Sequence, residues 1–174
     1  MTAQDRIAMV LTVSDRAFLA LQQDESGRLA VECLEREGWR VPETEIVPDE
    51  PAAIGSVLRR WCDSGVPHLI LTTGGTGLSP RDVTPEATLA VAERVVPGIA
   101  ERLRAQTAAE NPRSILSRGV AVVRRRTLII NLPGSPRAVQ ECCDVLFQVL
   151  PHAVSVLREK KNWAPDGSPG HGWR

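Results

Sequence analysis

The sequence predicts an α/β fold: a three-layer α/β/α sandwich around a mostly parallel sheet of Rossmann-like topology, with one β-hairpin. Two observations carry this prediction. Short apolar runs alternate with amphipathic segments along most of the chain, which is typical of right-handed βαβ units. In residues 119–132, by contrast, two β-rich runs are separated only by three arginines, as in a hairpin. The 174 residues fit one domain, expected over 1–158, and a tail at 159–174, rich in Pro, Gly and charge, is expected to be flexible.

The composition argues against a nucleic-acid or membrane partner. Lys plus Arg and Asp plus Glu both number 21, so no net charge attracts DNA or an anionic membrane. No apolar run approaches the ~18 residues of a membrane helix, and the N-terminus lacks the apolar core of a signal peptide. We therefore expect a cytoplasmic protein. Its four cysteines show no C-x-x-C spacing and are expected to be buried or half-buried free thiols: Cys33, Cys62, Cys142 and Cys143.

The N-terminal part of the chain contains the first two expected strands. Residues 7–13 form a continuous apolar run, which favours a strand in the middle of a sheet. Residues 16–27 are polar and irregular, and form either a flap over a site or a solvated connection. An amphipathic helix is predicted from Arg28 to a C-cap at Gly38. The second strand is expected within residues 39–47.

The next helix is predicted to begin at Pro51 and to end near Gly65, because proline is favoured in the first turn and glycine just beyond the last. Asp49 stands two residues before it. Two interpretations of this carboxylate are open: it is either the N-terminal cap of the helix or a site residue at the end of the preceding strand.

The central feature of the chain is a glycine-rich loop that follows an apolar run at residues 68–73. Gly74, Gly75 and Gly77 allow positive φ and a close approach of the backbone to a ligand, and Thr76 lies between them. Backbone N–H groups at the carboxyl end of such a strand attract phosphate. The loop is thus predicted to be either a phosphate site or a plain glycine turn.

The same connection carries a cation and a carboxylate, Arg81 and Asp82, beside the predicted phosphate site. Thr84 is expected to cap the next helix, with Pro85 in its first position. The usual nucleotide signatures are absent, because Pro80 stands where G-x-G-x-x-G needs its last glycine and no P-loop lysine follows. Neither an ordinary dinucleotide nor a Walker-type site is therefore expected.

The C-terminal half adds helices from residue 85 to about 95 and from 97 onward, and then the hairpin of residues 119–123 and 127–132. Arg124–Arg126 at its tip are expected either to be solvated or to contact phosphate or nucleic acid. Ser114 and Ser117 either approach the site or belong to an ordinary loop.

After the hairpin, the sequence repeats the pattern of the glycine-rich loop region: a strand, a glycine and then a capped helix that begins with proline. Gly134 follows the strand, Ser135 is expected to cap a helix, and Pro136 takes its first position, with apolar residues continuing in one long helix as far as Val156. Two helix N-termini are thus expected at the same edge of the sheet, as two anion sites.

Three carboxylates follow predicted strands. Asp15, which comes after Ser14 and the first strand, Asp49 and Asp82 are each placed at a strand's carboxyl end, and parallel strands open on one edge, so we expect these side chains to converge. Carboxylates beside phosphates are the ligands that Mg²⁺ prefers. The sequence therefore predicts a Mg²⁺ site.

Three motifs resemble the molybdopterin adenylyltransferase family, which includes the MogA-type enzymes and the G domain of gephyrin. They are VPDE at Val47 to Glu50, TTGGTGLSPRDVTPEAT at Thr72 to Thr88 and TLIINLPGSPRAV at Thr127 to Val139. The similarity runs in order from the first strand to about Leu157. It implies a three-layer domain, usually trimeric, that transfers AMP from Mg-ATP to the terminal phosphate of molybdopterin and releases pyrophosphate.

The resemblance also implies roles for individual residues. Asp49 and Asp82 correspond to the acids needed for adenylyl transfer and are expected to hold Mg²⁺. The loop from Gly74 to Gly77 corresponds to part of the nucleotide and pterin-phosphate site, while Arg81 is expected either to pair with a phosphate or to brace Asp82. The remaining residues expected to line the cleft are Ser14, Asp15, Gly134 and Ser135.

Two further functional expectations follow. The product would be handed to a molybdate insertase. The alternative to an enzyme is a non-catalytic molybdopterin-binding module or paralogue. The intact sequence Arg81-Asp82-Val83-Thr84 favours the enzyme.

Overall fold

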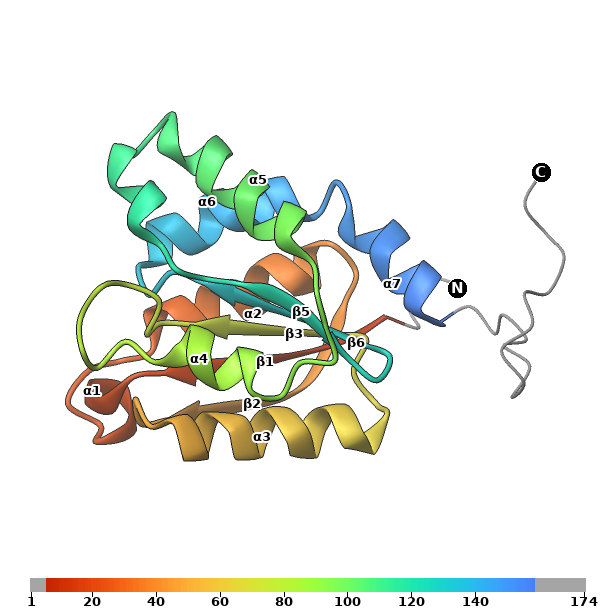
Figure 1. Ribbon diagram of the computed structural model, residues 1–174, viewed down its shortest axis with the longest axis horizontal. Helices are drawn as coiled ribbons and strands as arrows, with labels where there is room; N and C mark the ends of the chain where they lie inside the picture. Colours follow the sequence, from red (N-terminus) through yellow and green to blue (C-terminus); the bar gives the residue numbers. More distant parts are fainter. Residues whose placement is uncertain (1–5, 159–174) are drawn as a thin grey trace, which may run out of the picture.

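The computed structural model describes residues 6–158, so the tail predicted at 159–174 lies outside the described residues. A six-stranded sheet with the order β2-β1-β3-β6-β5-β4 forms its middle layer (Figure 1). The strands are β1 (Ile7–Val13), β2 (Arg40–Val47), β3 (Leu69–Thr73), β4 (Arg94–Val95), β5 (Ala121–Arg124) and β6 (Thr127–Leu132). β2, β1, β3 and β6 are parallel, whereas β5 runs antiparallel to both β6 and β4. The mostly parallel sheet and the hairpin are therefore confirmed.

Helices cover both faces of this sheet (Figure 1). One face packs against α2 (Glu25–Arg36), α5 (Pro97–Ala108), α6 (Pro136–Leu146) and α7 (Leu150–Arg158), and the other against α3 (Pro51–Ser64) and α4 (Thr84–Leu89). Alternate residues of β1 divide between the two cores: Ala8 and Val10 join the first, Met9 and Leu11 the second. The three-layer prediction is confirmed. No helix within residues 6–158 is long and apolar enough to cross a membrane.

Several predicted helix limits differ from the observed ones. α2 begins at Glu25 rather than Arg28, because the Asp24 carboxylate accepts a hydrogen bond from the Gly27 N–H and caps the helix earlier. The helix expected to reach residue 95 ends at Leu89, and β4 then pairs with β5. The single long helix after residue 136 is two helices, α6 and α7, since Pro151 has no N–H to continue the α6 hydrogen-bond pattern.

The structure shows the surroundings of the four cysteines and of the three arginines at the hairpin tip. All four cysteines are free and buried, as expected, and burial raises the pKa of Cys62 and of Cys142 to about 12. Of the arginines at the hairpin tip, Arg125 and Arg126 are exposed to solvent as expected, while Arg124 is half-buried, and Arg124 and Arg126 also contact the rest of the protein. Arg124 pairs with Asp63 at 2.9 Å, and Arg126 donates to the Leu157 carbonyl at 3.3 Å.

The buried side chain of Asn131 links two strands of the sheet to helix α4, which packs on it. The Asn131 side chain, in β6, donates to the hydroxyls of Thr72 and Thr88, each at 2.9 Å, and accepts from the Val120 N–H at 3.2 Å. Its three contacts connect β6 to β3, to α4 and to the segment before β5. Asn131 thereby fixes the height of α4 over the end of β3, next to the glycine-rich loop.

Candidate active site

Two adjoining pockets open at the carboxyl ends of the parallel strands. The first has a volume of about 290 Å³ and the second about 390 Å³, and both are lined by Gly75, Asp82 and Gly134. They are therefore two parts of one cleft that meet at these three residues. The cleft lies where an open α/β sheet is expected to bind its ligand.

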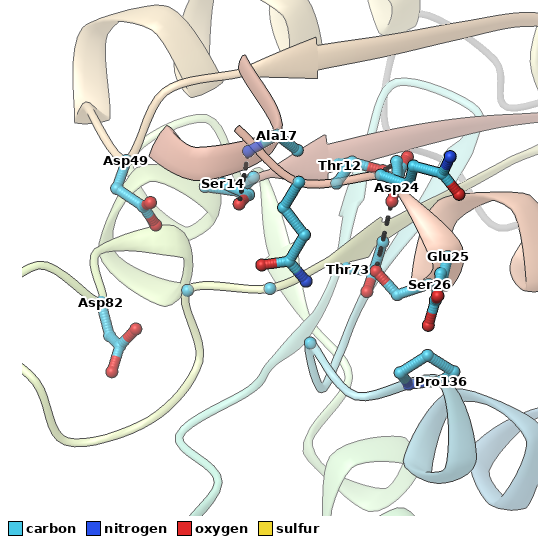
Figure 2. A pocket seen from close by; sticks show the side chains of 16 residues that line it. Thr12, Ser14, Ala17, Asp24, Glu25, Ser26, Asp49, Thr73, Asp82 and Pro136 are labelled. Carbon is cyan, nitrogen blue, oxygen red and sulfur yellow. Dashed lines mark hydrogen bonds between the residues drawn. The ribbon is translucent and has the colours of Figure 1, made fainter. Parts of the chain in front are cut away.

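The first pocket lies over the ends of β1 and β3. Figure 2 shows Asp49 and Asp82 on its left side and Asp24, Glu25 and Ser26 on its right. These last three residues all belong to the segment 16–27, whose role the sequence left open. The segment contributes to the pocket wall and is not merely a solvated connection. Ser14, also in the wall, accepts a hydrogen bond from the Ala17 N–H and caps the short helix α1 (Asp15–Phe18).

The second pocket extends from the glycine-rich loop toward a 3₁₀ helix, Pro112–Leu116. Its wall includes the predicted residues Thr76, Gly77 and Ser135, and also Asn111, Arg113, Ser114 and Ser117. Ser114 and Ser117 therefore do approach the cleft. The sequence did not predict Asn111 and Arg113, because the connection between α5 and β5 carries no pattern that shows which way it folds.

Two of the three predicted carboxylates are locked together at the edge of the cleft. The Asp15 N–H donates to Oδ2 of Asp49 at 2.9 Å, and the Asp49 N–H donates to Oδ1 of Asp15 at 3.0 Å. Arg81 donates to Oδ2 of Asp15 at 2.6 Å. Asp15 does not line either pocket, so its part is to hold Asp49 and Arg81 in place. The expectation that Arg81 braces Asp82 is wrong, because its partner is Asp15.

Asp49 is neither a helix cap nor an ordinary surface acid. Glu50 occupies the cap position of α3 and makes no side-chain cap bond, which rules out the capping interpretation of Asp49. Partial burial raises the pKa of Asp49, and the negative charges of Asp15 and Asp82 raise it further, although the Asp15 N–H and the Arg81 charge act in the opposite direction. Asp49 therefore lies in a place where a bound cation would be favourable.

Asp82 lies against the other side of the glycine-rich loop. Its Oδ2 accepts from the Ser79 N–H at 2.9 Å and is 2.9 Å from the point where a Cβ on Gly77 would stand. Oδ1 of Asp49 is likewise 3.1 Å from the Cβ position of Gly75. Glycines at these two positions thus let both carboxylates approach the loop backbone closely.

The loop backbone itself is partly free to bind an anion. Gly74 and Gly75 have φ of +95° and +63°, and the Gly74 N–H already donates to the Leu132 carbonyl at 3.3 Å. The N–H groups of Gly75, Thr76 and Gly77 have no acceptor among residues 6–158. These three N–H groups, and not that of Gly74, are therefore the ones available to an anion.

The two helix starts differ from each other. Thr84 does not cap α4: its hydroxyl donates to the Gly74 carbonyl at 2.9 Å, and its N–H donates to the Gly75 carbonyl at 3.1 Å. The start of α4 is buried beneath the loop and lines neither pocket. At the second start, the Ser135 hydroxyl caps α6 as predicted, accepting from the Ala138 N–H at 3.3 Å, and Pro136 lines the first pocket. Of these two helix starts, only that of α6 therefore lines the cleft.

The carboxylates fit a divalent cation that is shared with phosphate. Within residues 6–158 no group of three Asp, Glu, His or Cys side chains could hold a metal ion by itself. Asp49 and Asp82 do line one pocket, beside the free loop N–H groups. Mg²⁺ is usually bound by one or two carboxylates plus substrate phosphates and water, and does not need a complete protein cage.

The chain was compared with known protein families and curated sequences. The family described as "Probable molybdopterin binding domain" matches residues 9–152. The molybdopterin adenylyltransferase of Escherichia coli (strain K12) is 45% identical over 142 residues, covering 80% of this chain and 72% of that protein. The molybdopterin adenylyltransferase of Helicobacter pylori (strain ATCC 700392 / 26695) is 40% identical over 150 residues, covering 85% of each.

Solved structures agree with these sequence matches. The molybdopterin biosynthesis enzyme MoaB from Thermus thermophilus superimposes with a TM-score of 0.83 at 48% identity, over 87% of this chain and 96% of that one. The molybdopterin biosynthesis Mog protein from Mycobacterium ulcerans gives a TM-score of 0.82 at 41% identity, over 87% and 99%. Sequence and fold thus point to the same relatives.

Proposed function

This chain belongs to the molybdopterin-binding family that contains the molybdopterin adenylyltransferases, and on that premise we propose that it adenylylates molybdopterin with Mg²⁺ and ATP. The observation that carries the proposal is the division of the cleft: two pockets meet at Gly75, Asp82 and Gly134. Each pocket would take one substrate, and the phosphates of both would meet at the shared residues. The protein thus acts as a transferase in molybdenum cofactor biosynthesis.

The reaction needs alignment more than it needs a base. The terminal phosphate of molybdopterin has a second pKa of about 6, so it is mostly a dianion at neutral pH. One of its oxygens attacks the α-phosphorus of ATP, and the bond to the bridging oxygen breaks, with pyrophosphate leaving with the electron pair. No proton has to be removed from the nucleophile. The protein has to bring two anions together in line and offset their charge.

The residues around the loop supply these functions. Asp49 and Asp82 would hold Mg²⁺, which offsets phosphate charge when bound. The N–H groups of Gly75, Thr76 and Gly77 point to phosphate binding because they have no acceptor within the described residues. The Arg81 side chain is 59% exposed and held by Asp15, so it can contact a phosphate without losing its partner.

The proposal extends to the oligomeric state of the protein and to its location in the cell. We propose a cytoplasmic homotrimer that passes its product to a molybdate insertase. An apolar pocket of about 540 Å³ between α5, α6 and α7 is lined by Ile99, Val145 and Val149 among others. Because Val149 is 48% exposed in the single chain, this face is our candidate for the contact between copies.

A mass-spectrometric assay tests the activity. Purified protein is incubated with molybdopterin, ATP and Mg²⁺, in parallel with Asp82→Asn and with a sample containing a chelator. We expect adenylylated molybdopterin and pyrophosphate only from the wild type with Mg²⁺, while Asp82→Asn still binds the pterin. If the wild type binds molybdopterin tightly but forms no product, the chain is a binding module and the proposed activity is wrong.

A further inference from the structure

Arg118 contacts the loop of residues 76–82, which carries Asp82, at the start of that loop. The Arg118 backbone N–H donates to the Thr76 carbonyl at 2.9 Å, and its Nε donates to the Gly77 carbonyl at 2.7 Å. The residue lies in the segment between the 3₁₀ helix and β5. Its side chain is about one third exposed and lines neither pocket.

The same guanidinium also contacts the end of the loop. Nη2 of Arg118 donates to the backbone carbonyl of Asp82, and Nη1 pairs with the carboxylate of Glu86 in α4. One side chain therefore joins the start of the loop, its end and the following helix. A guanidinium is suited to this because its donors point in several fixed directions within one plane.

Apart from the contacts of Arg118, the Arg81 side chain ties the loop to Asp15, donating to its Oδ2 at 2.6 Å. Residues 78–81 are all exposed, and Leu78 is 65% exposed, so no apolar core anchors them. The internal contacts are local: the Ser79 N–H donates to the Asp82 carboxylate and the Asp82 N–H donates to the Ser79 carbonyl, both at 2.9 Å. These contacts set the shape of the turn around Asp82, whereas Arg118, together with the Arg81–Asp15 pair, sets where that turn lies relative to the cleft.

We infer that Arg118 is a positioning residue: it fixes the backbone of Asp82 so that the carboxylate lies where the two pockets meet. The inference rests on the proposed function, since Asp82 is the acid proposed to hold Mg²⁺. Arg118 does not contact the cleft and acts only through the loop. Lysine is a poor replacement, because one ammonium group cannot reach acceptors at both ends of the loop and on α4.

The test compares three variants: Arg118→Gln, Arg118→Lys and the matched control Glu86→Gln. The control removes the ion pair but leaves the bonds from Arg118 to both loop carbonyls. Two readouts are measured on each folded protein: steady-state kinetics over a range of Mg²⁺ concentrations, and hydrogen exchange of the amides in residues 77–82. Hydrogen exchange does not depend on the enzyme being active.

We expect Arg118→Gln to lower kcat by about 10- to 100-fold, to raise the Mg²⁺ concentration for half-maximal activity and to speed exchange in residues 77–82. KM for ATP should change little. Arg118→Lys should restore little of this loss, and Glu86→Gln should stay within about threefold of wild type.

Unchanged exchange in residues 77–82 of both Arg118 variants would overturn the inference, as would a full kcat with an unchanged Mg²⁺ requirement. A loss of kcat that comes only with global destabilisation, without a change in the Mg²⁺ requirement, would also overturn it and indicate a general structural role. If the wild type forms no product, the proposed function fails, whereas faster exchange in the variants would still support the bracing of the loop by Arg118.

Discussion

Asp15 and Asp49 exchange hydrogen bonds across the ends of β1 and β2, each donating its backbone N–H to the other's carboxylate, at 2.9 and 3.0 Å. Both oxygens of Asp15 are engaged, since Arg81 donates to the one that Asp49 does not use. Asp15, placed by the sequence among the cleft residues, thus supports Asp49 from behind. The pKa of Asp49 therefore depends on two neighbours of opposite charge, Asp15 and Arg81.

The first prediction concerns the acid limb of the pH–activity profile. Burial raises the pKa of Asp49, the Asp15 charge raises it further, and the Arg81 charge lowers it. In the proposed reaction Asp49 must be ionised to hold Mg²⁺, so Asp15→Asn should shift the acid limb to lower pH and Arg81→Gln to higher pH. The profile is measured as kcat/KM at constant Mg²⁺ concentration. Shifts in the same direction for both variants would contradict this account.

The second prediction concerns stability. The pKa of Asp49 is raised in the folded protein, so the folded state binds more protons than the unfolded state between the ordinary value of 3.8 and the raised value. The free energy of unfolding therefore falls as pH rises through this window. Asp49→Asn, which cannot titrate, should be as stable as the wild type or more stable at neutral pH, and this advantage should shrink toward about pH 3.8.

Urea denaturation at several pH values measures this difference. The variant is also expected to lose transfer activity by more than about 100-fold, because one proposed Mg²⁺ ligand is removed. A variant that is less stable than the wild type at neutral pH, but not at low pH, would show that the Asp49 charge is favourable in the fold.

The third prediction concerns crowding at the loop. Gly75 and Gly65 both have left-handed backbones, with φ of +63° and +70°. A Cβ on Gly75 would stand 2.4 Å from the Thr84 hydroxyl and 3.1 Å from Asp49, whereas a Cβ on Gly65 meets nothing within 4 Å. Gly65→Ala should cost about 1 kcal/mol of stability from backbone strain alone.

Gly75→Ala should cost about 2–4 kcal/mol, because steric overlap is added to the same strain. It should also reduce transfer activity, since Asp49 must move, whereas Gly65→Ala should leave activity unchanged. Both are measured by urea denaturation and by the transfer assay. Equal costs for the two substitutions would exclude crowding as the reason for glycine at position 75.

The fourth prediction concerns assembly. Val149 lines the apolar pocket between α5, α6 and α7, while Val156, exposed to a similar degree at 51% against 48%, does not. In the proposed trimer, Val149→Asp should dissociate the copies because a carboxylate would be buried without a partner. Val156→Asp should leave the assembly intact. Light scattering coupled to size-exclusion chromatography measures the mass, and a Val149→Asp trimer would place the interface elsewhere.

The sequence predicted correctly those elements whose limits depend on local sequence pattern. β1 begins and ends where predicted, at Ile7 and Val13, because a short continuous apolar run is typical of a strand that is covered on both faces. α3 begins at Pro51 as predicted and ends at Ser64, before the left-handed Gly65. The roles assigned to Asp49 and Asp82 remain predictions, although the structure places both in the wall of one pocket.

The differences arise where a distant partner competes with a local preference. Thr84 has the sequence of a helix cap, but its hydroxyl bonds instead to the Gly74 carbonyl, ten residues earlier. Asp24 gave no signal of its own, yet it caps α2, accepts from the Thr12 hydroxyl at 2.6 Å and lines the first pocket. Asn131 could have been noticed, as a polar residue within an apolar strand.

The sequence by itself determined the sheet, the glycine-rich loop and the presence of acids at the strand ends, because these depend on local pattern and on the parallel direction of the strands. Only the tertiary structure decided which acids face the cleft, that Arg81 pairs with Asp15, and that Arg118 holds the loop. Hydrogen bonds and ion pairs form between groups that folding brings within about 3 Å. Such proximity between residues as far apart as Gly77 and Arg118 is set by the packing of the whole domain.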